Sequence, residues 1–421
     1  MNKNESVNIA WQTQAAIYGS GFFSFSMVLI SNLVIAVMAY ELTESEFLIG
    51  MIVGSRYFLT LALSIHGGVL MDRFGTRRVM IVVAAIATVA PVFFPIALAL
   101  PQGPAITAII LLQMINGVSD TMVWMGTQAL SGQIMKGRHL YIGRMTSIVR
   151  IGAFLGPILF GFIWDQLGIW TTFIAMAIWS GMGFWFVLKI PETALKGKSS
   201  DKLTINISDL IPRFKDYISA FRLIAVPAIA LVLVVTFVRI GGTSIQSSFY
   251  VVFLKDINFP VTLIGILLGV AQLIASGGSL LAQPFSKIIH VHWLLLLAVS
   301  VTVVTVSLTP LLAFGTGLWP IFTLLVLVIS IRGFFLGMCQ AMEISMLGQN
   351  IGGDQQGIGV GLRTTANRIA SSFVPPLMGA IAELIGIESS FFVMGGFLLF
   401  VVAMASYFVR QQQSLGKSDK I

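Results

Sequence analysis

The chain has 421 residues, of which 57% are hydrophobic and 10% are charged, and its mean hydropathy is +0.93. A soluble domain carries about 25% charged residues, so this composition excludes a protein whose main solvent is water. The net charge of +8 does not require a nucleic-acid partner, because 19 of the 25 basic residues fall in one set of loops.

Long apolar runs separated by turn or charge clusters predict an all-α membrane protein with twelve spanning helices. The runs are continuously apolar and lack the ten-residue alternation of an outer-membrane barrel, so helices are expected rather than strands. In chain order the predicted spans are 14–40, 47–71, 79–100, 104–131, 140–164, 170–190, 223–250, 260–285, 292–314, 318–347, 357–383 and 389–410.

The loops between these spans divide by charge. Twelve spans place both termini on one side, and the loops of that side carry 19 Lys or Arg. The loops of the other side carry Lys255 as their one basic residue, beside seven acids. Since basic loops stay in the cytoplasm, we expect a multi-pass protein of the cytoplasmic (inner or plasma) membrane with both termini cytoplasmic.

The chain also repeats itself within this membrane-type sequence. Residues 143–173 align with residues 361–391 at a constant offset of 218, with nine identities in 31 positions. The identical pairs include Arg150 with Arg368 and Pro157 with Pro375, and Asp165 meets Glu383. An internal duplication in a polytopic protein indicates a two-fold transporter with its substrate site between the halves.

The repeat predicts two six-helix bundles and a connection between them. The expected division is an N-terminal bundle at 1–190, a cytoplasmic linker at 191–222 and a C-terminal bundle at 223–421. The linker mixes Lys, Asp, Ser and Thr before an apolar stretch that contains Pro212.

The second and third spans are joined by a glycine- and charge-rich motif. An Asp surrounded by Arg at a helix end can form a charge latch between helices. The motif reads G-x-L-x-D-R-x-G-x-R-R and contains Gly68, Asp72, Arg73, Gly75, Arg77 and Arg78. It resembles the cytoplasmic signature of the major facilitator superfamily, although Thr76 stands at a position that is usually basic in that family.

Two further segments bear on this resemblance. The fifth span contains Gly152, Gly156, Pro157 and Gly161 in a pattern similar to a motif of the family's drug/proton antiporters, from which Phe160 departs. On the fourth span, Gln113 stands where the family often has an arginine. The resemblance implies two pseudo-symmetric six-helix bundles around a central cavity that opens alternately to each side, with spans one, four, seven and ten as its usual lining.

Charged residues also lie inside the predicted spans. They are Arg56, Arg150, Arg239, Arg332 and Arg368, with the acids Asp120 and Glu343. An ionised side chain at the centre of a bilayer costs about 2.5–3.5 kcal/mol on insertion scales, so these groups should face one another or a wet cavity. Two interpretations stay open: the arginines brace the helices, or their surplus positive charge receives an anionic group of a solute.

These observations give the candidate residues. For substrate binding they are Arg56, Arg239, Arg332, Asn32, Gln246 and Gln272, and for proton coupling the candidate is Asp120. For gating they are Gly68, Asp72, Arg73, Gly75, Arg77, Arg78, Arg150, Gly156, Pro157 and Arg368.

The predicted function is secondary active transport of a small organic solute, which the arginines suggest is anionic, by alternating access. Proton coupling is expected, and efflux is favoured over uptake by the motif of the fifth span. The alternatives are an uptake symporter for an organic anion and a transporter-like sensor without transport. We expect a monomer in the lipid bilayer, with no catalytic constellation, cofactor, metal site or nucleic-acid partner, because no such motif occurs in the sequence.

Overall fold

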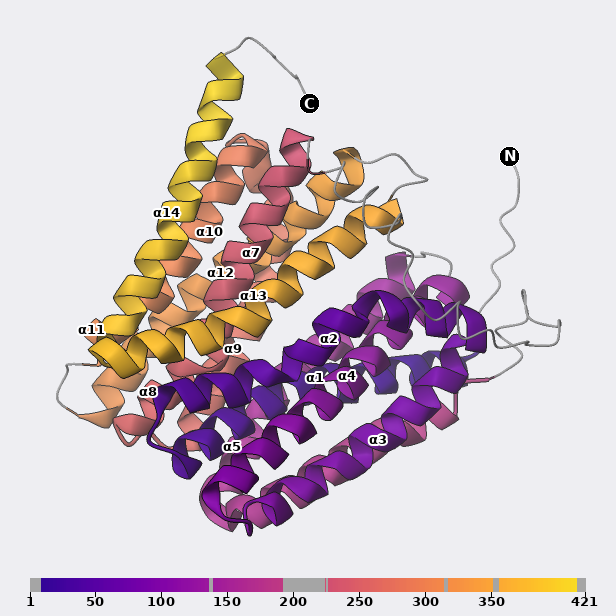
Figure 1. The fold of residues 1–421 in the computed structure, drawn as a ribbon. Coiled ribbons are helices and arrows are strands. Elements are labelled where there is room, and N and C mark those ends of the chain that lie inside the picture. Colours follow the sequence, from indigo (N-terminus) through magenta and orange to yellow (C-terminus); the bar gives the residue numbers. More distant parts are fainter. Residues whose placement is uncertain are drawn as a thin grey trace.

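The computed structural model describes residues 9–135, 139–191, 224, 226–313, 317–350 and 356–414, and its regular elements in these ranges are helices (Figure 1). The predicted linker therefore lies outside the described residues, except for Pro191. The first bundle contains α1 (Trp11–Leu42), α2 (Glu46–Phe74), α3 (Thr76–Ala97), α4 (Gln102–Met135) and α5 (His139–Leu188). The second contains α7 (Pro227–Ser247), α8 (Phe249–Asp256), α9 (Val261–Ser286), α10 (Val291–Ser307), α11 (Thr309–Leu312), α12 (Leu318–Asn350), α13 (Gln356–Ile385) and α14 (Ile387–Ser414).

The described helices account for the twelve predicted spans. Ten of them are long and apolar enough to cross a membrane, and Val291–Ser307 is a shorter apolar helix. The 50-residue helix α5 contains two spans, because Gly168 turns the chain with a φ of 77°. Gly386, which aligns with Gly168 in the repeat, has a φ of 87° between α13 and α14. A positive φ is accessible to glycine without steric cost, so the duplication preserves the turn as well as the helices.

The two bundles meet at one end and diverge toward the other. Figure 1 shows them close together near α8 and separated near the N and C labels. We call the closed end the acidic end, because Glu41, Asp165, Asp256 and Glu383 lie there in contacts between the bundles or beside them. The opposite end, which carries Arg77 and Lys189, is the basic end.

The bundles contact each other mainly through two helix pairs, α2 with α13 and α5 with α9. On α9, Gly265 and Gly269 lie against the backbone of Pro157 and Phe154, so that an added Cβ would overlap a carbonyl oxygen. On α2, Gly50 and Gly54 lie in the same way against Pro375, Pro376 and Ser372 of α13. Glycine permits this close crossing because it has no side chain at the contact. Since Pro157 and Pro375 are partners in the repeat, the two crossings are pseudo-symmetric.

The α5–α9 crossing yields a stability prediction. Replacing Gly265 with Ala should lower the stability of this packed state, because the new methyl group meets the Pro157 carbonyl. Overpacking of this kind typically costs about 1–3 kcal/mol. The thermal unfolding midpoint of the detergent-purified protein measures it.

The matched control is Gly277→Ala on the same helix, where an added Cβ meets no atom within 4 Å. We expect its midpoint to equal or exceed that of the wild type, because alanine favours helix more than glycine does. Equal midpoints for the two variants would contradict the close crossing.

Candidate functional site

The first bundle contains a buried ion pair that joins three helices. Arg56 of α2 places Nη2 2.7 Å from Oδ2 of Asp120 on α4, and its Nη1 donates to the Ser31 hydroxyl of α1 at 2.6 Å. Both charged side chains are 3% exposed or less. Gly117 allows the approach, because a Cβ there would overlap the Arg56 backbone. The charges of the proposed binding residue Arg56 and the proposed proton carrier Asp120 therefore neutralise each other.

Asp120 also faces a small cavity within the first bundle. The cavity has a volume of about 20 Å³, and its lining includes the hydroxyl-bearing residues Ser24 and Ser180. The Ser180 hydroxyl is buried and has no hydrogen-bond partner among the described residues. A cavity of about 10–15 Å³ or more can hold one water molecule where two to four polar partners are present, and Asp120, Ser24 and Ser180 are the polar side chains in an otherwise apolar lining. Asp120 thus has room for a hydrogen-bonding molecule on a side that its arginine does not occupy.

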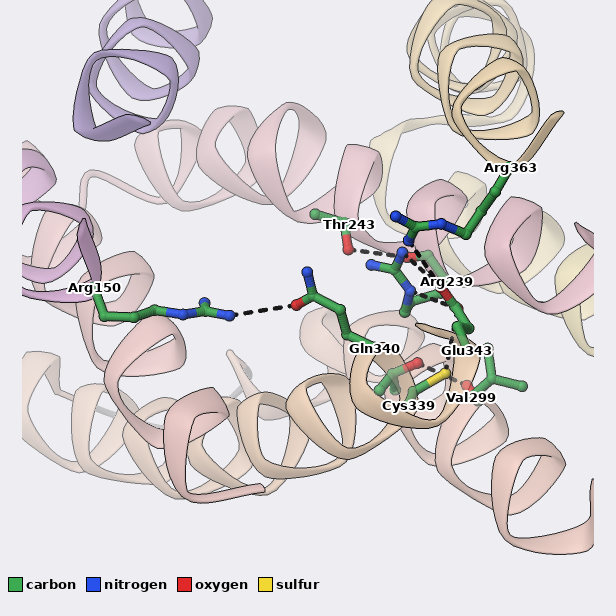
Figure 2. A network of polar contacts seen from close by, with 9 residues as sticks. Arg150, Arg239, Thr243, Val299, Cys339, Gln340, Glu343 and Arg363 are labelled. Atoms are coloured by element: carbon green, nitrogen blue, oxygen red, sulfur yellow. Dashed lines mark hydrogen bonds and ion pairs between the residues drawn. The ribbon is translucent and has the colours of Figure 1, made fainter. Parts of the chain in front are cut away.

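The second bundle contains its own buried ion pair (Figure 2). Arg239 of α7 donates to Glu343 of α12 through Nε at 2.7 Å and through Nη2 at 3.0 Å. Arg363 of α13 places Nη1 3.8 Å from the same carboxylate, and the Cys339 thiol lies 3.6 Å from it. A bidentate arginine–carboxylate pair is geometrically specific. The proposed binding residue Arg239 is therefore held by a carboxylate within its own bundle.

Arg332 of α12 differs from Arg56 and Arg239 because no carboxylate lies within 4.0 Å of it among the described residues. It is 0% exposed, and its Nη1 donates to the side-chain oxygen of Gln246 on α7. Its Nε and Nη2 have no described hydrogen-bond partner. Arg332 and Gln246, two of the predicted binding residues, are thus brought together in a setting that leaves a positive charge unneutralised.

The repeat partners Arg150 and Arg368 both reach across the interface between the bundles. Arg150 of α5 donates to Gln272 of α9 at 2.8 Å. It also donates to Gln340 of α12 at 3.3 Å (Figure 2). Arg368 of α13 lies over the ring of Tyr57 on α2, with 5.6 Å between Cζ and the ring centroid. Each bundle therefore contributes one guanidinium to the other, and the described contacts of both are to uncharged groups.

At the acidic end, each bundle places a carboxylate on a helix N-terminus of the other. Asp165 of α5 accepts from the amides of Val261 and Thr262 on α9 at 3.1 and 2.7 Å, and from the Thr262 hydroxyl at 2.7 Å. Glu383 of α13 accepts from the Phe47 amide of α2 at 2.9 Å and from the Ser45 hydroxyl at 2.8 Å. The first amides of a helix lack partners inside the helix and favour negative charge. These two contacts hold the bundles together at the acidic end.

The signature between the second and third spans is described in part. Gly75 ends α2 with a φ of 87°, and Arg77 donates to the Leu188 carbonyl at the end of α5 at 3.1 Å. Arg78 lies beside it on α3 and is exposed. The side chains of Asp72 and Arg73, and the surroundings of Gly68, lie outside the part of the chain that the structure describes.

The remaining candidates are distributed over the first bundle. Gly156 of α5 packs against Ile30 and Ser26 of α1, whereas Pro157 contacts Gly265 across the interface. Asn32 is 7% exposed on α1. Gly156 therefore contributes to packing within its bundle, and Pro157 to the contact between the bundles.

The geometry agrees with comparisons to known proteins. The sequence model of the Major Facilitator Superfamily matches residues 17–330 and 232–420. The chain belongs to this superfamily. Two curated relatives, both named quinolone resistance protein NorA from Staphylococcus aureus, are 24% identical over 352 residues (strain MRSA252) and 25% identical over 353 residues (strain Mu50). Each alignment covers 81% of this chain and 82% of the relative.

Solved superfamily structures share the fold. The nucleoside transporter NupG superimposes with a TM-score of 0.73 at 13% identity, covering 94% of this chain and 98% of that chain. A D-xylose-proton symporter superimposes with a TM-score of 0.69 at 14% identity, covering 93% of this chain and 96% of that chain. Because the superfamily model matches most of the chain, the protein is a multi-pass membrane transporter of the Major Facilitator Superfamily and not an enzyme.

Several interacting residues of this superfamily member were not among the predicted site residues. Glu343 accepts hydrogen bonds from Arg239, and Gln340 accepts one from Arg150. The ring of Tyr57 lies under Arg368. Each of these partners lies on a different span from its arginine. Asp165 and Glu383 are repeat partners in the sequence, which places both in the loops of the acidic side. Their equal place in the repeat was the one sequence signal for a paired role.

The Arg239–Glu343 pair yields a second stability prediction. Glu343→Gln should destabilise the protein by about 3–5 kcal/mol, because it leaves a buried arginine without its carboxylate. Thermal unfolding of the purified protein measures the change, and the double variant Arg239→Gln/Glu343→Gln should recover part of it. A loss no larger than that of Lys255→Gln, whose ion pair with Glu41 at 3.4 Å is solvent-exposed, would contradict this assignment.

Proposed function

We propose that this superfamily member is a secondary active transporter that moves a small organic solute across the cytoplasmic membrane by alternating access, with protons as the coupling ion and efflux as the favoured direction. The supporting observation is the pair of pseudo-symmetric crossings, α2 with α13 and α5 with α9, closed at the acidic end by Asp165 and Glu383. The bundles diverge toward the basic end (Figure 1). Two rigid bundles with reversible contacts at one end are what a rocking mechanism needs.

The distribution of basic residues supports an orientation. If the basic end lies in the cytoplasm, both termini are cytoplasmic, and the described arrangement is closed to the outside. Transport then requires the contacts of Asp165 and Glu383 to break and contacts at the basic end to form. The Asp72–Arg73 signature is at the right end to supply the latter.

The resemblance to NorA supports a drug-like solute. Those relatives are named for quinolone resistance, and a quinolone carries a carboxylate as well as an aromatic body. In this chain, Arg150 and Arg368 present guanidiniums at the interface without a described carboxylate partner. A guanidinium can bind two oxygens of one carboxylate. We therefore propose a small organic solute with an acidic group, bound between the halves near Arg150, Arg368 and Gln272.

Proton coupling is assigned to Asp120. Its carboxylate is held by Arg56 at 2.7 Å and borders a water-sized cavity. Protonation would remove the negative charge and release Arg56 from the pair, which changes the contacts between α2 and α4. Because α2 also forms the α2–α13 crossing, this change is transmitted to the moving interface.

The test is pH-gradient-driven flux of a labelled quinolone in proteoliposomes. Wild-type protein should accumulate the solute when the interior is acidic and the exterior is not, as expected for exchange of solute against protons. Asp120→Asn should remove the dependence on the gradient, since the amide cannot carry the proton. The control Glu388→Gln alters an exposed acid in the first turn of α14 and should keep the wild-type response.

Gradient-dependent accumulation by Asp120→Asn at the wild-type rate would refute its coupling role. Binding of solute without any flux in the wild type would refute transport itself.

A second candidate function is uptake of an organic anion together with protons. It is favoured by the same surplus of positive charge, because Arg150 and Arg368 have no described carboxylate within ion-pair distance. The two candidates differ in the sign of the coupling. Accumulation with an alkaline interior, rather than an acidic one, would select uptake.

Alternating access yields a further prediction at the acidic end. Val261 is 0% exposed, and its amide is held by Asp165. In the background Val261→Cys/Cys339→Ala, we expect Asp165→Asn to raise labelling by a membrane-impermeant maleimide several-fold, because a neutral amide holds the α9 N-terminus less strongly. Labelling of intact cells measures the effect from the outer face.

Glu388→Gln in the same background is the control and should leave the labelling rate unchanged. Labelling that is equally slow with and without Asp165→Asn would show that this carboxylate does not keep the acidic end closed.

A further inference from the structure

The second bundle contains a cluster of buried hydrogen-bond donors around Arg332 that the transport cycle proposed above does not use. Arg332, Gln246 and Tyr250 are 0%, 5% and 1% exposed. Tyr250 lies on α8, four positions after Gln246 in the sequence. Four polar atoms of this cluster have no described hydrogen-bond partner: Nε and Nη2 of Arg332, Nε2 of Gln246 and the Tyr250 hydroxyl.

All four of these atoms can donate a hydrogen bond. Both Arg332 nitrogens and the Gln246 nitrogen are donors only, and the tyrosine hydroxyl can also donate. The side-chain oxygen of Gln246 already accepts from Arg332. An uncompensated buried charge is destabilising by several kcal/mol, whereas a bound acceptor of negative charge would satisfy the donors and neutralise the guanidinium together.

The helix break beside the cluster adds to this setting. Helix α7 ends at Ser247 and α8 begins at Phe249, so Gln246 and Tyr250 lie on either side of the interruption at Ser248. Interrupted membrane helices commonly border ion sites, because their backbone can be irregular only where partners are supplied. Gly242 also leaves room next to the guanidinium, since a Cβ there would still be 3.8 Å from Nη2.

We propose that Arg332, Gln246 and Tyr250 form a binding site for a small inorganic monovalent anion of the chloride class. The near-complete burial of all three side chains favours an ion of this size over the acidic group of an organic solute. Arg332 and Gln246 would then serve the stability of the second bundle rather than recognition of the transported molecule.

The test is halide-dependent thermal unfolding of the purified protein, with sodium gluconate replaced stepwise by sodium chloride or bromide at constant ionic strength. We expect a saturable rise of the unfolding midpoint, because a ligand that binds the folded state stabilises it. Benzoate, which carries a carboxylate on a bulky ring, should give no such rise. The unfolding midpoint does not depend on flux, so this experiment can fail without contradicting the transport proposal.

The decisive variant is Gln246→Glu, which places a carboxylate against Arg332 in the position of the present amide. It should unfold at a high midpoint in gluconate and should lose the response to halide. The matched control is Gln272→Glu, which places a carboxylate against Arg150 in the same way and should keep the response. Tyr250→Phe should raise the half-saturating chloride concentration several-fold, since it removes one donor and preserves the ring.

Three outcomes in the halide titrations, and one in the benzoate titration, would overturn the proposal. The first three are a wild-type midpoint that does not distinguish halide from gluconate, a full halide response in Gln246→Glu, and loss of the response in Gln272→Glu, which would place the anion at Arg150. A benzoate response equal to that of chloride would also overturn it, because it would assign the donors to the acidic group of an organic solute.

Discussion

The arrangement of the two bundles in this transporter depends on direct backbone contact at the α2–α13 and α5–α9 crossings, where no side chain lies between the helices. In the membrane, lipid is as apolar as the helix surfaces, so helices associate through close packing and polar contacts rather than through hydrophobic burial. Glycines on α2 and α9 allow that packing against the prolines of α13 and α5. The short approach brings Asp165 and Glu383 onto the opposing helix ends, and it brings Arg150 and Arg368 within reach of the opposite bundle.

Apart from Arg332, the buried arginines fall into two kinds because of this arrangement. Within each bundle an arginine and an acid neutralise each other, as Arg56 with Asp120 and Arg239 with Glu343. Between the bundles the arginines meet amides or an aromatic ring. Partners without charge are easily exchanged, because separating them does not leave two opposite charges apart in a medium of low dielectric constant. The arginines of the moving interface and those of the two bundles are thus distinguished by whether their partners carry a charge.

The sequence predicted the fold closely, because apolar runs, loop charges and the repeat are local or linear signals. All twelve spans could be inferred in this way, whereas the turns at the repeat partners Gly168 and Gly386 come from the structure. The partners of the buried arginines could not, since Arg239 and Glu343 are 104 positions apart in the sequence and their contact depends on helix rotation. The count of five intramembrane arginines against two acids suggested a surplus of positive charge shared by all five. In the structure, the arginines without a described carboxylate partner are Arg150, Arg332 and Arg368.

The two contacts at the acidic end are related by the repeat but are not identical. Asp165 reaches its helix end with a short side chain, whereas the equivalent place in the repeat is filled by the longer Glu383, whose contacts with Ser45 and Phe47 measure 2.8 and 2.9 Å. A shorter side chain loses less rotational freedom when it is fixed. The bundles should consequently separate first at the α2–α13 crossing, while α5 and α9 stay in contact. The two halves of the duplicated fold would then open asymmetrically.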